Sequence, residues 1–469
     1  MRRLSAVGQY RPIAHCLFRQ SDLRGRIGAV REIGISADDL VSALLASGEP
    51  VCILDSCGVG YTGSHLLIAG VRPAESVEIS MEDPEETLRL LDTKLSGDNP
   101  SIFTLSYGFG AKIQNIGTRS KGAQAEPDVF IATFDALIVH DHETHRTFVK
   151  DKSGNLSGME QLLAGRFKES FRTCPVITAV SNFSRSDYLA AVETIKEYIR
   201  EGETYQTNLT QQIHARLPSS ITPELVFWRL RRDHPAAFAA FIRRSDSTVV
   251  SASPERFISV EREKIRDPAR LIRTSPIKGT RRRGRNRQED REYREELIAS
   301  AKDRAENTMI VDLLRNDLGR VCEFGSVRVE ALCELEEHPT LFHLVSTVSG
   351  KLRQNIRFSD ILRATFPCGS ITGAPKIRTM QIIDEIETAE RGLSMGAIGC
   401  YLPNGFGISD SIFELNVAIR TMVIREQEAV FNVGGGITID SSAEQEYEES
   451  LLKAKALLAA MNAKLKLND

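Results

Sequence analysis

Two pairs of acidic residues have the spacing that places both carboxylates on one face of a helix. Asp303 and Glu306 lie three residues apart in AKDRAENTMIVDLL, and Glu446 and Glu449 repeat this spacing in AEQEYEESLLKAKALL. Residues three or four apart are neighbours on a helix surface, and paired carboxylates can bind one divalent cation. For either helix alone, salt bridging on a solvated face is the simpler interpretation. Two such helices in one chain suggest a cation site.

Groups that could bind an anion follow in the last quarter of the chain. FPCGSITGAPK contains Gly369 and Gly373 among small hydroxyl residues ahead of an expected helix, and VGGGITIDS places three glycines (434–436) at the end of an expected strand. Such turns present backbone N–H groups, although each could simply be a tight turn. Arg420 interrupts the apolar strand-like segment NVAIRTM. A buried arginine there needs a carboxylate from the protein or from a substrate.

A single lysine, Lys278, lies between proline and glycine in TSPIKGT. A lysine beside proline and glycine is usually a solvated loop residue, whereas an amine in a dry pocket can act as a nucleophile. The chain contains no Walker-type loop, no G-x-G-x-x-G after a strand and no G-x-S-x-G motif. The residues taken together predict a site for a small polyanionic substrate.

Length and composition indicate an ordinary folded enzyme. The 469 residues include 41% hydrophobic and 26% charged residues, and the formal net charge is −3. These values predict two domains or one large one, and they argue against nucleic acid or membrane as a partner. Eight cysteines without a C-x-x-C motif, together with the lack of a secretion signal, favour reduced thiols and a cytoplasmic location. An organelle transit segment at the start is the minor alternative.

The expected elements predict an α+β fold with antiparallel sheets and outer helices. Residues 1–175 form a strand-rich region with one expected helix at 83–97, and residues 176–469 mix strands with long helices. The long helices are expected at 186–202, 290–319, 374–388 and 443–465, and one continuous strand is expected at 247–261. The charged run RRRGRNRQEDREYREE (281–296) is expected to be a solvated loop that leads into a helix.

Eight blocks carry a resemblance to a known family. They read GETYQTNLTQQ, SPERFI, TSPIKGTRRRG, DRAENTMIVDLLRNDLGRVCEFGSVRV, HLVSTVSGKL, FPCGSITGAPK, NVAIRTMV and VGGGITIDSSAEQEYEESLLKA. In their order and spacing, the chain from about Tyr188 onward resembles the chorismate-utilising enzymes. The resemblance implies large antiparallel sheets packed face to face with outer helices, an active site between them, and Mg²⁺ between protein acids and a substrate carboxylate.

The resemblance also implies roles for individual residues. Glu306 and Glu449 match the principal metal-binding acids, with Asp303 and Glu446 at secondary positions. His343 matches a histidine near the departing ring hydroxyl, and Thr280 is grouped with it and with Lys278 as catalytic. The residues expected to contact the substrate are Arg420, Lys453, Gly434, Gly435, Gly436, Thr372, Gln206 and Tyr401; the position of the family tyrosine itself is occupied by Cys400.

Two positions distinguish the reactions within the family. Isochorismate and salicylate synthases have a lysine base where this chain has Gln206, and glutamine cannot deprotonate water. The ammonia-using branch is therefore favoured. At the position of Lys278, anthranilate synthases have alanine, and the branch that forms 4-amino-4-deoxychorismate has lysine. We therefore expect chorismate and ammonia as substrates, Lys278 as a nucleophile and a separate glutamine amidotransferase subunit. Anthranilate synthesis is the enzymatic alternative, and a catalytically inactive regulatory homologue is the other.

Overall fold

The computed structural model describes residues 29–59, 65–117, 126–151, 162–167, 175–262, 270–338, 341–403 and 411–467. The possible transit segment, Cys16 and Cys174 lie outside the described residues. The six described cysteines form no disulfide bond. No helix among the described residues combines the length and the apolar composition that a membrane crossing requires.

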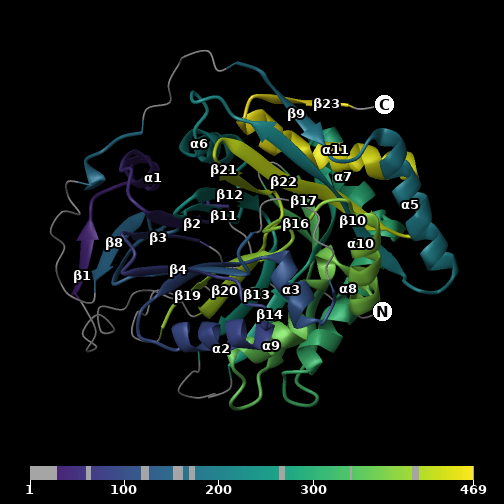
Figure 1. Cartoon of the computed structure of the whole chain (residues 1–469), viewed down its shortest axis with the longest axis horizontal. Coiled ribbons are helices and arrows are strands. Elements are labelled where there is room, and N and C mark those ends of the chain that lie inside the picture. The colour runs from purple at the N-terminus through teal and green to yellow at the C-terminus, as the bar shows by residue number, and fades with distance from the viewer. Residues whose placement is uncertain are drawn as a thin grey trace, which may run out of the picture.

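Two large sheets, almost entirely antiparallel, form the centre of the molecule (Figure 1). Sheet 1 has 13 strands within the described residues, and β18 (Gly373–Ala374) pairs with β10 off the main path. Its main path runs β1 (Ala29–Ile33), β8 (Arg146–Asp151), β7 (Ala136–Asp141), β3 (Leu66–Val71), β2 (Val51–Asp55), β11 (Phe238–Arg243), β12 (Ser247–Ser253), β21 (Thr421–Arg425), β22 (Glu428–Ile437), β10 (Gln206–Arg216), β9 (Ile177–Ser181) and β23 (Ala463–Lys466).

Sheet 2 has 10 strands within the described residues, and β16 (Arg328–Glu337) pairs with β17 off the main path. Its main path runs β15 (Ile277–Arg282), β17 (Leu341–Lys351), β14 (Leu271–Ser275), β13 (Arg256–Glu261), β20 (Ser411–Val417), β19 (Ala397–Tyr401), β5 (Ser101–Leu105), β6 (Val129–Thr133) and β4 (Glu75–Ile79). Each sheet therefore contains strands from both 1–175 and 176–469.

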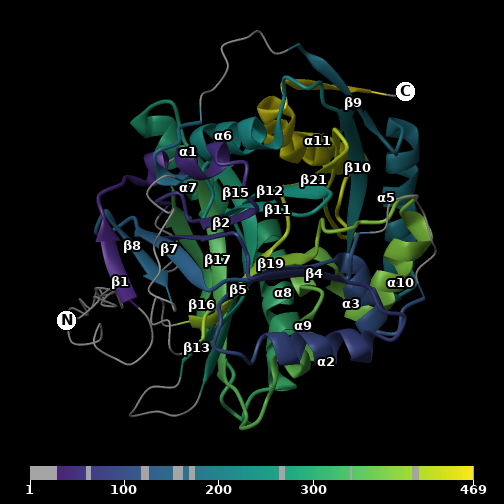
Figure 2. The same cartoon turned by 60° about the vertical axis from the view of Figure 1, so that its left-hand side comes forward.

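Helices cover the outer faces of both sheets (Figures 1 and 2). The outer face of sheet 1 is packed by α1 (Ala37–Ala46), α6 (Pro223–Asp233) and α11 (Ala443–Ala460). The outer face of sheet 2 is packed by α2 (Pro84–Lys94), α3 (Tyr107–Ile113), α8 (Ala301–Gly319) and α9 (Phe358–Thr365). The remaining helices are α5 (Arg185–Arg200), α7 (Arg287–Ala299), α10 (Lys376–Ile386) and the short 3₁₀ helix η2 (Gly369–Ile371).

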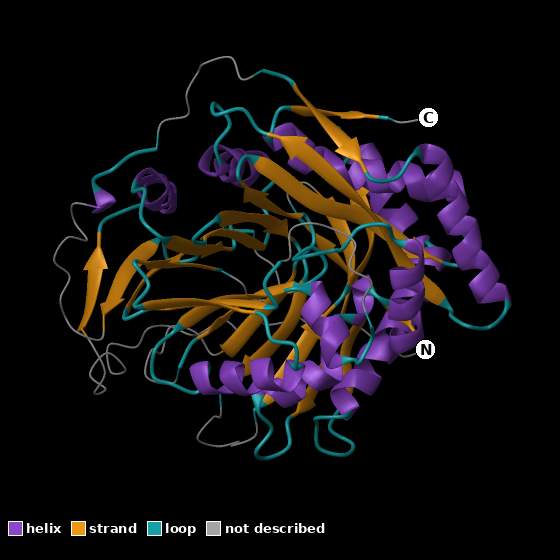
Figure 3. Cartoon of the chain, in the orientation of Figure 1, coloured by secondary structure: helices purple, strands orange, loops and turns teal. Residues whose placement is uncertain are grey.

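A third apolar core lies between the sheets. It joins Cys52 and Ile242 of sheet 1 to Phe130 and Ile398 of sheet 2. The layers are therefore helices, sheet, sheet and helices, and Figure 3 shows the orange strands between the purple helices. The α+β class and the face-to-face packing expected from the sequence are confirmed.

Five elements differ from the sequence prediction. The helix expected at 443–465 ends at Ala460, and the strand β23 begins at Ala463. The helix expected at 290–319 is two helices, because Ser300 ends α7 and caps α8 by accepting from the backbone N–H of Asp303. The strand expected at 247–261 is two strands in different sheets, since Pro254 has no N–H with which to continue a ladder. The amino-terminal region contains α1 and α3 besides α2, and Ser106 caps α3 in a segment predicted as strand.

Buried polar contacts anchor α8, the helix that carries Asp303 and Glu306. At its carboxyl end, Lys376 donates to Asp317 at 2.6 Å and to the Thr365 carbonyl at 2.8 Å, with both charged side chains nearly buried. Further back, the amide of Asn307 bonds Ser346 and the Leu344 carbonyl on β17. These contacts fix α8 against sheet 2 and against the turn that precedes α10.

The pair Lys376–Asp317 provides a test of this anchoring. Burial raises the pKa of Asp317 although Lys376 lowers it, so the carboxylate depends on its partner. We expect Lys376→Met to lower the free energy of unfolding by about 3–5 kcal/mol, because it leaves a buried charge unpaired. The double variant Lys376→Met/Asp317→Leu should recover most of this loss in urea unfolding at pH 7. A single-variant loss no larger than that of the double variant would contradict the interpretation.

Candidate active site

Strands β15 and β17 bring the lysine and the histidine of the sequence prediction to neighbouring positions. Thr280 is paired with His343 across the ladder, and its hydroxyl lies 2.8 Å from His343 Nδ1. Two residues earlier, the Lys278 ammonium donates to the Ser370 carbonyl at 3.3 Å. Between them, Gly279 has a φ of +85°, and a Cβ at this position would lie 3.0 Å from Asp303. Glycine therefore allows Lys278 to lie directly beside α8.

The hydroxyl-rich turn around η2 faces Lys278. Three successive backbone carbonyls of this turn accept hydrogen bonds from other parts of the chain. The Ser370 carbonyl accepts from Lys278, the Ile371 carbonyl accepts from Arg391 at 2.9 Å, and the Thr372 carbonyl accepts from the backbone of Asn208. The Thr372 hydroxyl donates to the Cys368 carbonyl at 3.1 Å. Its hydrogen is thus used within the turn, which leaves the oxygen of Thr372 as an acceptor.

Glu255 is a buried acid beside Lys278 that the sequence analysis did not identify. It lies where the chain crosses from β12 in sheet 1 to β13 in sheet 2, with 4% of its surface exposed. Its Oε1 is buried without a hydrogen-bond partner. Burial raises the pKa of Glu255 to about 7, although the Ser370 hydroxyl and the charge of Lys278 lower it. Near neutral pH, Glu255 can therefore either donate or accept a proton.

The acids of α11 lie beside Gly435 on β22. A Cβ on Gly435 would lie 3.1 Å from Glu446 Oε2, 3.6 Å from Lys453 Nζ and 3.8 Å from Glu449 Oε1. Lys453 Nζ binds Glu449 Oε1 and the Gly434 carbonyl, both at 2.8 Å. The absence of a side chain at position 435 therefore leaves room beside these carboxylates.

Lys302, on the first turn of α8, connects the two acidic pairs. Its Nζ lies 3.3 Å from Glu446 Oε1 and 3.9 Å from Glu306 Oε1. Asp303 is turned toward Arg281, whose Nη2 lies 3.3 Å from Asp303 Oδ2. The four acids predicted from the sequence therefore come from two helices that meet, and each already has a basic neighbour.

The protonation of these acids differs according to their neighbours. Burial raises the pKa of Glu306, and repulsion from Glu446 and Asp303 adds to this effect, although Lys278 and Lys302 oppose it. Burial also acts to raise the pKa of Glu449, but Lys453, Lys302 and Lys278 together lower it below its usual value. The acids are close enough to repel one another, as a cation site requires.

Among the described residues, no three His, Cys, Asp or Glu side chains already surround one point. The donor set nevertheless fits Mg²⁺. Carboxylate oxygens of Glu306 and Glu446 both lie within 4 Å of Lys302 Nζ, and Gly435 leaves space beside Glu446 and Glu449. Mg²⁺ usually takes few protein ligands and retains several waters. The ammonium of Lys302 lies between Glu306 and Glu446 and supplies a positive charge to both carboxylates.

Arg420 and Gln206 complete the polar groups expected to contact a substrate. Arg420 lies in a bend between β20 and β21 with a φ of +48°, and not within a strand as predicted. Among the described residues no group pairs with its guanidinium, and burial lowers its pKa. The Gln206 amide lies over Gly436, the neighbour of Gly435, and Gln206 Oε1 is buried without a partner. These unpaired groups can bind a polar, anionic ligand.

His343 is close enough to Arg420 to respond to its charge. Burial lowers the pKa of His343 to about 3, and the charges of Arg420 and His338 add to this effect. The imidazole is therefore neutral at physiological pH. It can donate or accept a hydrogen bond but carries no imidazolium proton.

Tyr401 does not lie at the site. The Glu255 carbonyl accepts from Val417, and Val417 pairs with Ala397 at the other end of β19. Tyr401 lies four residues further along the strand, about 13 Å away at the usual rise per residue. Its hydroxyl donates to the Gly97 carbonyl, and its ring packs on Phe413. Tyr401 is therefore a core residue and not a substrate contact as predicted. Its neighbour Cys400 is buried in the core between the sheets.

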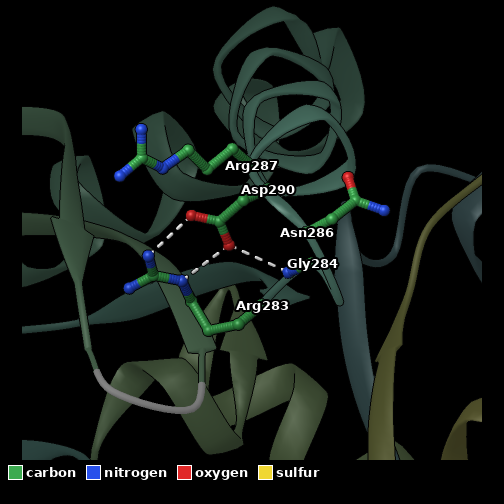
Figure 4. A pocket seen from close by; sticks show the side chains of 5 residues that line it. All are labelled: Arg283, Gly284, Asn286, Arg287 and Asp290. Carbon is green, nitrogen blue, oxygen red and sulfur yellow. Dashed lines mark hydrogen bonds and ion pairs between the residues drawn. The ribbon is translucent and has the colours of Figure 1, made fainter.

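The arginine-rich segment after β15 forms a separate surface pocket (Figure 4). The pocket is lined by Arg283, Gly284, Asn286, Arg287 and Asp290. The guanidinium of Arg283 and the N–H of Gly284 both bond the carboxylate of Asp290. Arg282 lies over the ring of Tyr293. The segment is thus a loop that leads into α7, as predicted, with much of its charge paired within the chain.

The residues missed by the sequence analysis are Glu255, Ser370, Lys302 and Arg391. Glu255 had a detectable signal, since an acid between two apolar strand-like runs in VVSASPERFISV is unusual in a core. Lys302 lies four residues before Glu306, a spacing that predicts an ion pair. Nothing local indicates that Ser370 would offer its carbonyl to a lysine 92 positions earlier in the chain.

The fold and the site define a class of enzyme. Residues 50–459 match the model of the chorismate binding enzyme family, and the chain belongs to this family. The chain is 34% identical over 391 residues to aminodeoxychorismate synthase component 1 of Bacillus subtilis, with 80% of each chain covered. It is 33% identical over 422 residues to the Escherichia coli protein of the same name, covering 87% of this chain and 88% of that one.

The solved structures agree with this assignment. Anthranilate synthase component I from Streptococcus pneumoniae superposes with a TM-score of 0.72 at 27% identity, covering 85% of this chain and 93% of that one. The family resemblance expected from the sequence is confirmed.

The protonation of Glu255 predicts a pH-dependent stability. Its pKa rises from 4.5 in the unfolded chain to about 7 in the fold, so the folded state binds the extra proton. This contribution is fully present below about pH 4.5 and is lost as the pH rises through about 7, a change of about 3 kcal/mol. We expect Glu255→Gln to lose less stability than the wild type between pH 5 and pH 8 in urea unfolding. Parallel stability curves would show that Glu255 is ionised throughout.

Proposed function

We propose that this chain is component 1 of an aminodeoxychorismate synthase, which converts chorismate and ammonia to 4-amino-4-deoxychorismate and water. The observation that carries the proposal is the position of Lys278. Its amine lies beside a neutral carbonyl and the buried acid Glu255, and it is close enough to Glu306 to lower the pKa of that acid. The named relatives from Bacillus subtilis and Escherichia coli support it.

The proposed reaction begins with substrate binding by charge. Arg420 is a partly buried arginine whose guanidinium has no partner among the described residues, and Lys453, which is bonded to Glu449, places a second cation near the backbone of Gly434. These groups fit the carboxylates of chorismate. Glu306 and Glu449 would hold Mg²⁺, with Asp303 and Glu446 as outer partners, and the ion would supply positive charge for the ring carboxylate of the substrate.

Lys278 is the proposed nucleophile. Its amine attacks C2 of the ring, the ring double bonds shift, and the C4 hydroxyl leaves as water. In the second step ammonia attacks C4, the double bonds shift back, and the lysine is released as a free amine. The enolpyruvyl group stays on the ring, and the net change replaces hydroxyl by amine.

Glu255 is the proposed proton carrier for both steps. In its protonated form it supplies the proton with which the C4 hydroxyl leaves, and as the carboxylate it takes the proton that Lys278 loses on forming the new bond. A pKa of about 7 suits both directions. The neutral His343, hydrogen-bonded to Thr280, is suited to orient the leaving hydroxyl.

Gln206 supports the use of ammonia. An amide cannot act as the base that activates water, whereas its buried and unpaired Oε1 can accept a hydrogen bond from ammonia. We propose that a separate glutamine amidotransferase subunit releases this ammonia from glutamine, in keeping with the component 1 names of the relatives. Anthranilate synthesis is the alternative, because a solved relative of the same fold is an anthranilate synthase component.

The product distinguishes the two reactions. We expect the purified chain with chorismate, Mg²⁺ and ammonium to give an amino product that retains the enolpyruvyl carbons in mass spectrometry. Lys278→Ala should lower kcat by about a thousandfold, since it removes the nucleophile. Lys94→Ala, on the surface of α2, is the matched control and should leave kcat unchanged. Anthranilate with released pyruvate would contradict the proposal.

The acids of α8 and α11 predict the metal dependence. Glu306→Gln and Glu449→Gln should each raise the Mg²⁺ concentration needed for half-maximal activity by about tenfold or more, because each removes a charged ligand. Glu444→Gln, which alters an exposed acid on the same helix as Glu449, should not. Equal Mg²⁺ requirements in all three variants would exclude these acids as ligands.

A further inference from the structure

A buried ion pair lies behind the turn that faces Lys278. Arg391 and Glu387 have side chains only 2% and 3% exposed, and they meet through two hydrogen bonds of 2.9 and 2.7 Å. Both lie in the chain after α10, and neither faces the acids of the site. The proposed function assigns this pair no chemistry.

Arg391 uses its remaining donors on two backbone carbonyls. Nη1 donates to the Ile371 carbonyl at 2.9 Å, and Nη2 donates to the Asn208 carbonyl at 2.6 Å. Ile371 directly follows Ser370, whose carbonyl accepts from Lys278. The planar guanidinium thus joins β10 to the turn that holds the lysine, and a planar fork of donors constrains both carbonyls at once.

Glu387 fixes the other side of the guanidinium. Its Oε1 accepts from the backbone N–H of Thr210 at 2.7 Å and from the Thr210 hydroxyl at 2.9 Å, besides binding Arg391. The position of the pair on β10 is therefore set by main-chain as well as side-chain contacts. Since breaking a buried pair leaves an uncompensated charge, the arrangement has little freedom to relax.

A residue of the amino-terminal region, Tyr107, packs against one face of this guanidinium. The ring of Tyr107 lies 4.6 Å from the guanidinium carbon of Arg391, and the backbone N–H of Tyr107 donates to the Gly392 carbonyl at 2.9 Å. Residues from 1–175 thus help to hold the turn beside the lysine.

We propose that Arg391, held by Glu387, is a positioning residue for Lys278. It fixes the Ile371 carbonyl and thereby the direction of the adjacent Ser370 carbonyl, to which the Lys278 amine is bonded. This inference rests on the proposed function of Lys278 as a nucleophile, because only a reacting amine requires such alignment. Displacement of a reacting group by about 1 Å can cost about a hundredfold in rate.

The chain offers a matched control for this role. Arg244 forms an equally buried pair with Glu126, donates to the Thr104 hydroxyl, and lies over the ring of Phe130. Like Arg391, Arg244 is contacted by a carboxylate, a polar acceptor and an aromatic ring. Unlike Arg391, it lies between the sheets and, within the described residues, has no hydrogen bond to the turn at η2. Arg244→Lys therefore measures what the loss of such a pair costs the fold alone.

The experiment compares Arg391→Lys with Arg244→Lys in the full chain. Both variants should lower Tm by similar amounts. We expect Arg391→Lys alone to lower kcat by about tenfold to a hundredfold, with KM for chorismate within about threefold, because one ammonium cannot reproduce the fork. If Arg391→Lys does not fold, Thr210→Val, which removes one contact to Glu387, should show a smaller change of the same kind.

A second readout does not depend on turnover. Without substrate, the rate at which acetic anhydride labels Lys278, followed by peptide mass spectrometry, should change about threefold or more in Arg391→Lys and stay unchanged in Arg244→Lys. Unchanged labelling in Arg391→Lys, or equal losses of kcat in both variants, would overturn the inference. The wild-type product tests the proposed function separately, so an anthranilate product would reject that function while the labelling comparison still decides the role of Arg391.

Discussion

Partial burial of charge at one end of the sandwich is the constraint on which the rest of the site depends. Moving an ion from water into a protein interior costs several kcal/mol unless partners replace its hydration. Each ionised group here is matched differently: Glu449 by Lys453, Glu306 by Lys302, and Lys278 by a carbonyl and a nearby acid. The protonation states follow from these matches, since a carboxylate with close cations stays ionised and one without a direct partner holds its proton.

The fold provides these partners by bringing elements from distant parts of the sequence to one end of the sandwich. The chain crosses from sheet 1 to sheet 2 at Pro254 and Glu255, because proline ends the first ladder and the next residues begin the second. This crossing places an acid at the boundary between the sheets, where neither ladder supplies a partner for its side chain. An apolar core fills the space between the sheets. Glu255 is buried at their boundary, and this burial raises its pKa because the ionised carboxylate loses its hydration.

The features that could be read from the sequence are local. The pairs Asp303/Glu306 and Glu446/Glu449 lie on helices as their spacing predicted, and the three glycines end β22. Contacts between segments that are distant in the sequence depend on the topology of the sheets, and local spacing does not predict them. Arg420 was expected in a strand because its neighbours are apolar, but a left-handed residue breaks the strand there. Tyr401 was expected at the site from the family resemblance, yet the register of β19 places it at the far end of the strand.

Two lysines of the site, Lys453 and Lys278, differ in their hydrogen-bond partners, and this difference suits them to different roles. Lys453 bonds the Glu449 carboxylate and the Gly434 carbonyl, and these two contacts hold its side chain in place. Lys278 bonds a carbonyl, which accepts one hydrogen bond without supplying a full negative charge, and its charge lowers the pKa of two nearby acids, Glu255 and Glu306, against the effect of burial. Lys278 therefore gives up only a 3.3 Å hydrogen bond to a carbonyl when it turns toward a substrate, whereas Lys453 is held by a carboxylate at 2.8 Å. The direction of a single carbonyl, that of Ser370, thus separates a lysine that binds from a lysine that can form a bond.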